Sequence, residues 1–288
     1  MSAIASVSYA LIEMNETELL FTDILNCNRL SLYLNKDIFL DKAKSSLVSG
    51  VLKRRIQGEP IQYILGKTEF MGLEFKVTPH VFIPRPETEI LVETVLEIAS
   101  SFKLHASRLN ILDIGTGSGN ISISLAKLLK DCRIIAVDIS KQAIVVAKNN
   151  AILNDVETKI SFIKQDFFDL QRAACSLQPK SFDFVVSNPP YISTAEIEAL
   201  QPEVKYEPHM ALDGGKDGLD FYRRIINKVP RYLRKDGFLI MEMGFNQKDA
   251  IKNIFQKTGY FETIELIKDY NNIDRIIIAK KREREWIN

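Results

Sequence analysis

The stretch that decides the fold is Ile111-Leu-Asp-Ile-Gly-Thr-Gly-Ser-Gly119. Its first residues are typical of a buried strand, and its glycines are typical of a turn into a helix, where only small residues let the backbone approach a ligand. A dinucleotide-binding turn has the spacing G-x-G-x-x-G. If the motif starts at Gly115, Asn120 stands where the third glycine would be. If it starts at Gly117, Ser122 stands there. The spacing therefore disfavours a nicotinamide or flavin cofactor.

Strand-like and helix-like stretches alternate along the chain from this turn onward. That alternation predicts an α/β fold, in which a mostly parallel sheet is covered by helices on both faces. A last helix over 247–257 and two strands over 261–267 and 274–280 predict a C-terminal antiparallel hairpin that closes the sheet. The other predicted strands cover 110–114, 133–137, 159–163, 182–187 and 238–243, and the helices between them cover 119–130, 140–154 and 217–234.

The residues before this region predict a separate helical domain. Apolar side chains recur at helical spacing between Asn15 and Gln57, and Asn15 followed by Glu18 is a helix-start signal. Two short strand-like runs around Met71-Gly72 predict a β-hairpin. We therefore expect a helical domain over 1–66, a hairpin linker over 67–83 and an α/β domain over 84–288.

The composition excludes several classes of protein. Thirty-eight basic and thirty-seven acidic residues leave a net charge of +1, so no global field draws the chain to polyanions. No apolar run approaches the ~18 residues of a membrane span, and the N-terminus lacks a basic segment typical of a secretory signal, so we expect a cytoplasmic protein. Three cysteines without a C-x-x-C pair predict reduced thiols (Cys27, Cys132 and Cys175), and three scattered histidines predict no metal site.

The glycine stretch has the form D-x-G-x-G-x-G, which resembles the S-adenosylmethionine loop of class I methyltransferases. The resemblance implies that the loop packs beneath the methionine and ribose parts of the cofactor, with Asp113 near its amino group. Two later strands end in Asp138 and in Asp166-Phe167. On the same pattern Asp138 accepts the ribose hydroxyls, Asp166 pairs with the adenine amino group and Phe167 lies against the ring. Taken singly, a glycine loop is often a plain turn and a strand-end carboxylate is often a helix cap, but three such signals in order are hard to dismiss.

The fourth strand of this region runs directly into Asn188-Pro-Pro-Tyr191. Asn-Pro and Pro-Pro are common turn dipeptides, but this tetrapeptide falls at the carboxyl end of a strand, beside the predicted cofactor. Methyl transfer to a planar amide or aromatic amine needs a lone pair that is otherwise delocalised. The Asn188 side-chain oxygen and the Pro189 carbonyl can each accept one hydrogen of an –NH2 group, which aims its nitrogen at the methyl. Tyr191 offers an aromatic wall. This chemistry suits adenine amines and glutamine amides equally.

Four motifs, one of which contains the tetrapeptide, together resemble one family over nearly the whole chain, that of the release factor glutamine N5-methyltransferases (HemK/PrmC). The motifs are Arg55-Ile-Gln-Gly-Glu-Pro-Ile61, Phe82-Ile-Pro-Arg-Pro-Glu-Thr-Glu89, Asn188-Pro-Pro-Tyr-Ile192 and Tyr206-Glu-Pro208. Family membership implies methylation of the glutamine in the Gly-Gly-Gln loop of class I peptide chain release factors. It also implies a Rossmann-like class I methyltransferase domain. Phe167 stands where other members carry tryptophan, and Tyr206 stands where phenylalanine is usual.

The resemblance assigns site residues by position. The residues predicted to contact S-adenosyl-L-methionine are Asp113, Gly115, Thr116, Gly117, Ser118, Gly119, Asp138, Asp166, Phe167 and Asn188. Those predicted to be catalytic and to hold the glutamine are Asn188, Pro189, Pro190 and Tyr191. Arg85 either contacts the substrate or pairs with a carboxylate, and 193–216 is predicted to be a lid.

Two alternatives remain open at this point. An adenine-N6 nucleic-acid methyltransferase shares the tetrapeptide, but it must bind phosphates and flip a base, which calls for a basic surface. This chain is nearly neutral, and up to His80 it has as many acidic as basic residues, so the helical domain suits a protein partner better. A non-catalytic binding protein is disfavoured because both motifs are intact. We expect a monomer that binds release factors and does not bind nucleic acid directly.

Overall fold

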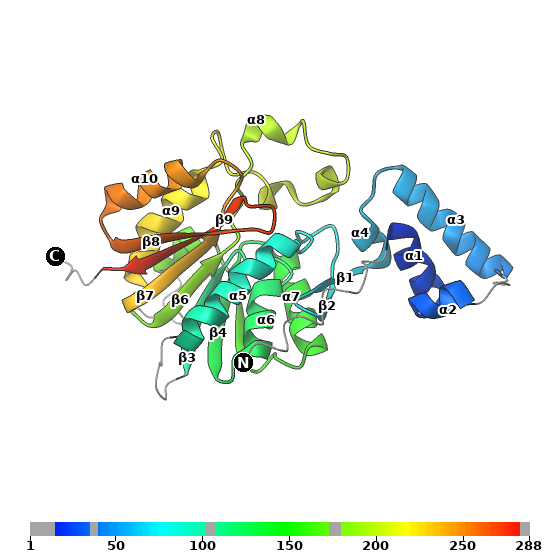
Figure 1. The fold of residues 1–288 in the computed structure, drawn as a ribbon, viewed down its shortest axis with the longest axis horizontal. Coiled ribbons are helices and arrows are strands. Elements are labelled where there is room, and N and C mark those ends of the chain that lie inside the picture. The colour runs from blue at the N-terminus through cyan, green and yellow to red at the C-terminus, as the bar shows by residue number, and fades with distance from the viewer. Residues whose placement is uncertain (1–14, 35–39, 102–107, 173–179, 283–288) are drawn as a thin grey trace. The chain divides into compact units, whose positions relative to one another are not determined.

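The computed structural model describes residues 15–34, 40–101, 108–172 and 180–282 (Figure 1). The chain divides into two compact units, the first ending at Gly66 and the second beginning at Lys67. No helix within the described ranges is long and apolar enough to cross a membrane. Cys27 and Cys132 are free thiols, and burial raises the pKa of Cys132. Cys175 lies outside the described residues.

The first unit is helical, as its periodicity predicts. Its first helix begins at a capping box, in which the Asn15 side chain accepts the Glu18 N–H at 3.0 Å and the Glu18 carboxylate accepts the Asn15 N–H at 2.9 Å. The helix-start signal read from these two residues is therefore confirmed. The helices of this unit are α1 (Glu16–Leu25), α2 (Arg29–Leu34), α3 (Lys42–Ile56) and α4 (Ile61–Leu65).

The fourth helix was not expected, because Gly58 and Pro60 predict the end of the helical segment. Pro60 instead stands directly before the first residue of α4, where its missing N–H costs nothing. Ile61 then packs against Leu20 and Val51, which form the small core of this unit. Burial of that side chain is what makes a further helical turn favourable.

The second unit contains a seven-stranded sheet in the order β5-β4-β3-β6-β7-β9-β8. The pairs from β5 to β7 are parallel, and β9 pairs antiparallel with both β7 and β8. A mostly parallel sheet closed by an antiparallel hairpin is the predicted fold class, which is confirmed. The strands are β3 (Leu109–Ile114), β4 (Cys132–Asp138), β5 (Ile160–Lys164), β6 (Phe182–Ser187), β7 (Leu233–Glu242), β8 (Phe261–Lys268) and β9 (Asp274–Lys281).

Helices cover both faces of this sheet (Figure 1). Side chains alternate across a strand, so Ile111 of β3 joins the core beneath one set of helices and Leu112 joins the core beneath the other. The first core includes Leu91 and Ile123, and the second includes Tyr222 and Phe255, all almost fully buried. The helices concerned are α5 (Pro86–Ser101), α6 (Asn120–Leu128) and α7 (Lys141–Leu153) on one side and α9 (Asp220–Lys228) and α10 (Lys248–Thr258) on the other.

The predicted hairpin is present as β1 (Lys67–Phe70) and β2 (Leu73–Lys76), an antiparallel pair. It belongs to the second unit, and its Phe70 and Phe75 are buried in the first of the two cores of that unit. The buried Asn150 of α7 fixes its position. The Asn150 side chain accepts the Lys76 N–H at 2.8 Å, and it donates to the Lys76 and Ser118 carbonyls at 2.9 Å each. One side chain thus joins the hairpin to the glycine turn.

The helix predicted over 217–234 is shorter than expected. α9 ends at Lys228, a single 3-10 turn η5 (Val229–Arg231) contains Pro230, and β7 begins at Leu233. A proline inside a helix removes a backbone hydrogen bond and clashes with the preceding turn. Pro230 therefore breaks the helix, as its position predicts. The residues beyond it extend the central sheet, so β7 starts five residues before the predicted strand.

The three hydrogen bonds of Asn150 lead to a stability prediction. Asn150→Ala removes a fully buried side chain and leaves the backbone groups of Lys76 and Ser118 without these partners, so it should lower the free energy of unfolding by about 2–4 kcal/mol. The neighbouring Asn149 is exposed, and Asn149→Ala should change it by less than about 0.5 kcal/mol. Urea unfolding of both variants measures the difference. Equal values would contradict the anchoring role of Asn150.

Candidate active site

A cavity of about 420 Å³ opens at the carboxyl ends of the parallel strands in the second unit. The chain runs from β3 outward through β4 to β5 and then returns to the other side of β3 as β6. Ligands of open α/β sheets bind where the strand order reverses in this way. The cavity is lined by the segments that follow these strands, namely 114–118, 137–140, 165–168 and 187–192, and by residues from 200–212 and from the start of α5.

The glycine turn after β3 brings backbone into the cavity. Gly115 and Gly117 have φ angles of 75° and 56°, which side chains disfavour. A Cβ atom placed on either glycine would meet no protein atom within 4 Å, so both face open space. Gly119 differs, because a Cβ atom there would lie 2.9 Å from Ile123 and 3.1 Å from Ala147. The first two glycines thus make room for a ligand, whereas the third lets the start of α6 pack closely against Ala147 of α7.

Asp113 lies directly behind this turn and is fully buried. One carboxylate oxygen, Oδ2, accepts the Thr116 hydroxyl at 2.7 Å and the Ser122 hydroxyl at 2.5 Å. The other oxygen, Oδ1, has no hydrogen-bond partner within the described residues. Burial raises the pKa of Asp113 from 3.8 to about 6, and the two hydroxyls oppose that rise. A buried acceptor without a partner is costly, so it marks a place where a ligand's donor would be favourable.

Asp138, at the end of β4, holds the other side of the turn. Its Oδ2 accepts the Gly117 N–H at 2.9 Å and its Oδ1 accepts the Ser140 N–H at 2.8 Å. Burial raises the pKa of this carboxyl, while its backbone donors lower it. Each carboxylate oxygen accepts a second hydrogen bond, so Asp138 can still bind ligand hydroxyls in the cavity that it lines.

The segment after β5 supplies the aromatic part of the cavity. Phe167 lines it but is mostly buried, and it packs against Phe168 and Tyr232 with ring centroids 5.5 and 5.6 Å away. The Asp166 carboxylate accepts the Phe168 N–H at 2.8 Å and lies 4.0 Å from the Arg224 guanidinium. The Arg224 guanidinium itself lies 3.6 Å from the centre of the Phe168 ring.

The predicted tetrapeptide follows β6, the strand next to β3, and lines the same cavity as the glycine turn. The Ser187 hydroxyl donates to the Ile114 carbonyl at 2.8 Å, which joins the ends of β6 and β3. The Asn188 amide then donates from Nδ2 to the Thr88 hydroxyl at 3.1 Å, and that hydroxyl donates to Glu242 at 2.6 Å. Pro189 and Pro190 also line the cavity.

Tyr191 is held by its backbone and enclosed by its surroundings. Gln247 donates from Nε2 to the Tyr191 carbonyl at 2.8 Å, and its Oε1 accepts the Gly244 N–H at 3.0 Å. Burial raises the pKa of the Tyr191 hydroxyl, so this side chain stays neutral and acts as an apolar wall. Gly214 fits against the tetrapeptide too, because a Cβ atom there would lie 2.9 Å from the Pro190 carbonyl oxygen.

Arg85 pairs with a carboxylate, which was one of its two expected roles. Its guanidinium forms an ion pair with Glu207, whose side chain is 1% exposed. Glu207 also accepts the Ile83 N–H at 3.0 Å, and burial raises its pKa. The Arg85 guanidinium lies 4.8 Å above the Phe82 ring. Two of the sequence motifs, those containing Arg85 and Glu207, therefore bind each other.

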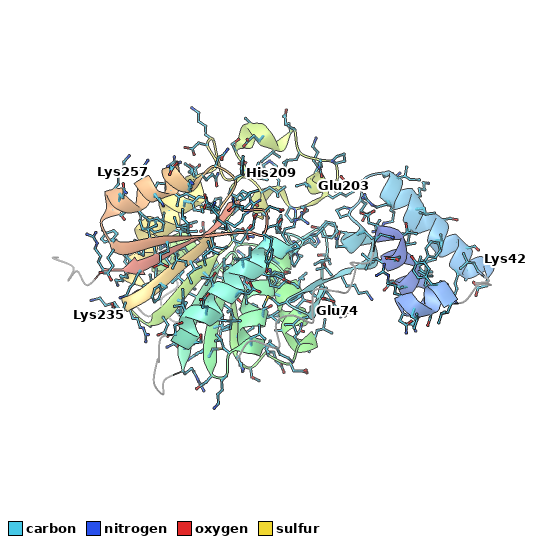
Figure 2. The ribbon with its side chains drawn as sticks, in the orientation of Figure 1. Lys42, Glu74, Glu203, His209, Lys235 and Lys257 are labelled. Carbon is cyan, nitrogen blue, oxygen red and sulfur yellow. The ribbon has the colours of Figure 1, made fainter. Side chains whose placement is uncertain are left out.

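The segment between β6 and α9, which was predicted to be a lid, contains several short helical turns. They are α8 (Thr194–Ile197), η3 (Val204–Tyr206) and η4 (His209–Ala211). Figure 2 labels Glu203 and His209 within it. Leu200, Val204 and Met210 line the cavity, so part of the segment forms its apolar side. The segment contacts the rest of the site at three residues among others. Glu207 forms the ion pair with Arg85, Gly214 packs against the Pro190 carbonyl, and Gly218 packs against the Tyr191 carbonyl.

The structure brings nearly all of the predicted site residues together. Among the described residues, Asp113 and Gly119 do not line the cavity and lie just behind it. Some lining residues carry no motif of their own and were not predicted, such as Ile139, which is 48% exposed, and Phe168. Their only signal is that each follows a predicted ligand residue at a strand end. Thr88 lies within the motif Phe82–Glu89 but was not assigned a role, and Arg224 and Glu242 reach the site by folding alone.

Two family models match the sequence. A methyltransferase domain model covers residues 105–285, and a PrmC N-terminal domain model covers residues 10–66. A release factor glutamine methyltransferase of Geobacter sulfurreducens is 43% identical over 91% of this chain and 87% of its own length. One from Buchnera aphidicola is 37% identical over 97% of both chains.

The chain belongs to the release factor glutamine methyltransferase family. Members of this family use S-adenosylmethionine, and the cavity fits that cofactor. It offers open space beside Gly115 and Gly117 and a carboxylate at Asp138, and the unpaired buried acceptor of Asp113 lies just behind it.

Solved structures show the same fold at low sequence identity. The catalytic domain of hMettl16, solved in complex with MAT2A 3'UTR hairpin 6, superimposes with a TM-score of 0.59 at 15% identity, over 88% of this chain and 95% of that one. A methyltransferase from Pyrococcus furiosus gives a TM-score of 0.51 at 17% identity, over 84% of this chain and all of its own. These likenesses confirm the class I methyltransferase fold.

The raised pKa of Asp113 predicts a pH dependence of stability. The folded state binds the proton of the Asp113 carboxyl more tightly than the unfolded chain does. The free energy of unfolding therefore falls as pH rises from the unfolded pKa of 3.8 toward about 6. Asp113→Asn has no carboxyl to titrate, so this fall should be absent. The difference in unfolding free energy, variant minus wild type, should therefore rise between pH 3.8 and about 6 and stay constant above that. Urea unfolding at a series of pH values measures it. Asp131→Asn, which removes an exposed carboxyl, should keep the wild-type dependence.

Proposed function

We propose that this chain transfers a methyl group from S-adenosyl-L-methionine to the side-chain amide nitrogen (N5) of the glutamine in the Gly-Gly-Gln loop of class I peptide chain release factors. The observation that carries the proposal is the orientation of Asn188. Its Nδ2 donates to Thr88, which leaves Oδ1, the other end of the planar amide, to face the cavity that Asn188 lines. A hydrogen-bond acceptor at that point suits the –NH2 group of a primary amide.

The chemistry requires that the glutamine nitrogen be aimed and its hydrogens held. S-adenosylmethionine, when bound, supplies an electrophilic methyl group on a sulfonium. The Asn188 side-chain oxygen and the Pro189 carbonyl each accept one amide hydrogen, which directs the nitrogen lone pair at the methyl and stabilises the positive charge that develops. Pro189 also stiffens the loop, and Tyr191 packs against the planar amide. The geometry needs no strong base before transfer.

The remaining site residues divide between the two ligands. Gly115, Thr116, Gly117 and Ser118 form the wall that faces the cofactor, and Gly119 sets the helix behind it. Asp113 accepts the cofactor's amino group through its unpaired oxygen, and Asp138 accepts its ribose hydroxyls. Asp166 and Phe167 take the adenine, with Phe168 and Ile139 as additional apolar neighbours. Arg85 acts on the substrate side by holding Glu207, and with it the segment that contains Met210.

The helical unit is the proposed docking domain for the release factor, and 67–83 is the proposed linker to a methyltransferase domain over 84–288. Several apolar side chains of the helical unit are exposed, including Leu52 at 48% and Ile56 at 85%. These two lie one turn apart on α3, so they form one apolar strip. The proposed substrate is a translation factor, so the proposed location is the cytoplasm. We propose a monomer that does not bind nucleic acid directly.

The direct test is methyl transfer from labelled S-adenosylmethionine to a purified class I release factor, with duplex DNA in a parallel reaction. Mass spectrometry then locates the added methyl. We expect it on the loop glutamine and expect no label on the DNA. Label on the DNA alone would reject the proposed substrate.

Two substitutions separate the proposed roles of Asn188 and Asp138. Asn188→Ala should lower kcat by about 100-fold or more, because the acceptor that holds the reacting amide is lost. Its affinity for S-adenosylmethionine should change by less than about tenfold, since the glycine turn and Asp138 remain. Asp138→Ala should instead weaken cofactor affinity by about 10–100-fold through the loss of charge-assisted hydrogen bonds. Calorimetry and steady-state kinetics measure both. Equal losses of binding and turnover in Asn188→Ala would mean that its role is misassigned.

The docking proposal predicts a difference between long and short substrates. The double variant Leu52→Ser with Ile56→Ser should raise KM for the whole release factor by about tenfold, because about 1–2 kcal/mol of apolar contact is lost. KM for a short peptide of the Gly-Gly-Gln loop should stay the same. Val145→Ser with Ile152→Ser removes two exposed apolar side chains from α7 of the other unit and serves as the control. A double variant that raises KM for both substrates equally would reject docking through α3.

A further inference from the structure

The amide group of Asn188 has two ends of nearly the same size and shape. One end is an acceptor and the other carries two donors, so only the neighbouring groups decide which end faces the substrate. The proposed reaction needs the oxygen there. A reversed amide would put an –NH2 group against the –NH2 group of the glutamine, and no hydrogen bond would hold the reacting nitrogen.

Thr88 decides the orientation of that amide. Its hydroxyl has a single proton and donates it to the Glu242 carboxylate at 2.6 Å. The Thr88 oxygen therefore has only lone pairs to offer Asn188, 3.1 Å away. Only the Nδ2 end of the amide can bond there. An acceptor at Thr88 excludes the reversed amide, because two acceptors would then face each other.

Glu242 in turn decides the direction of the Thr88 proton. An ionised carboxylate only accepts hydrogen bonds, so the hydroxyl must point toward it. Asn188 also bonds to this carboxylate, which strengthens the same orientation. Glu242 is 2% exposed and ends β7, and Thr88 is 1% exposed in the first turn of α5. Neither residue lies near Asn188 in the sequence, so the sheet and the first helix turn bring the three together.

We propose that Thr88 and Glu242 are positioning residues, which hold the Asn188 amide with its oxygen toward the substrate. This inference rests on the proposed function, because it concerns the same amide and the same transfer. Thr88 and Glu242 do not touch the substrate and act through Asn188. Thr88 lies in the sequence motif Phe82–Glu89, in which only Arg85 otherwise has a proposed role.

The same geometry makes the orientation dependent on pH. Burial raises the pKa of Glu242 from 4.5 to about 7, against the opposing effect of Thr88, Arg275 and Asn188. A protonated Glu242 donates to Thr88, and the Thr88 proton is then free to point at Asn188, so the reversed amide becomes possible. The ionisable groups that face Glu242 are Glu87 of α5, Tyr191 after β6, Tyr222 of α9 and Arg275 of β9. Turnover should therefore fall as pH drops below about 7.

Three variants on one helix test the role of Thr88. Thr88→Val removes the hydroxyl with little change of shape, Thr88→Ser retains it, and Thr94→Val makes the same change at another buried threonine. The Thr94 hydroxyl bonds only the Ile90 carbonyl of its own helix, at 2.6 Å. Thr88→Val should lower kcat by about 10–100-fold, while KM for the release factor and the cofactor affinity change by less than about threefold. Thr88→Ser should keep most of kcat, and Thr94→Val should keep all of it.

The pH profile of kcat tests the role of Glu242 separately. Wild type should lose activity on the acid side, whereas Glu242→Gln should be slower and lack this acid limb, because no carboxyl remains to be protonated. If Thr88→Val does not fold, this comparison decides the proposal. The proposal is overturned if Thr88→Val and Thr94→Val have the same kcat, if Thr88→Ser is as slow as Thr88→Val, or if Glu242→Gln keeps the acid limb. A wild-type enzyme that fails to methylate the glutamine would instead reject the proposed function.

Discussion

The position of β3 between two parallel partners is the constraint on which the site depends. β3 pairs with β4 on one side and with β6 on the other, and the carboxyl ends of all three strands therefore meet at one edge of the sheet. The glycine turn follows β3, Asp138 ends β4 and Asn188 follows β6. The glycine turn and Asn188, which lie far apart in the sequence, thus line one cavity. Hydrogen bonds from Gly117 to Asp138 and from Ser187 to Ile114 hold these strand ends together.

Around this edge, the protein stabilises its ligand groups with buried polar contacts that also limit their motion. Glu207 binds Arg85 and the Ile83 backbone, Gln247 binds the Tyr191 carbonyl, and Glu242 binds Thr88. A buried polar group is stable only when it is fully hydrogen-bonded, so each contact permits few alternatives. Asp113 is the exception, since one of its oxygens lacks a partner within the described residues. A ligand donor at that oxygen would complete the hydrogen bonding of the site.

Much of this arrangement was predictable from local sequence. The strand order along the chain, the hairpin at the C-terminus and the capping box at Asn15 follow from periodicity and from side chains within a few residues of one another. The helix break at Pro230 is equally local. The extra helix α4 was not predictable in this way, because it depends on the burial of Ile61 against Leu20 and Val51. The early start of β7 depends likewise on the pairing of Leu233 with Phe182 of β6.

By itself, the sequence determined which chemical groups the protein has and at which strand ends they lie, because parallel strands order their carboxyl ends along one edge. It determined the family too, through motifs spread over nearly the whole chain. Only the tertiary structure decided how these groups are oriented. It paired Arg85 with Glu207 rather than leaving it free, and it placed Gly119 behind the cavity. It also joined Thr88 to Asn188, 100 residues away in the sequence, and to Glu242, 154 residues away. Hydrogen bonds of that kind depend on distances in space, which no pattern along the chain records.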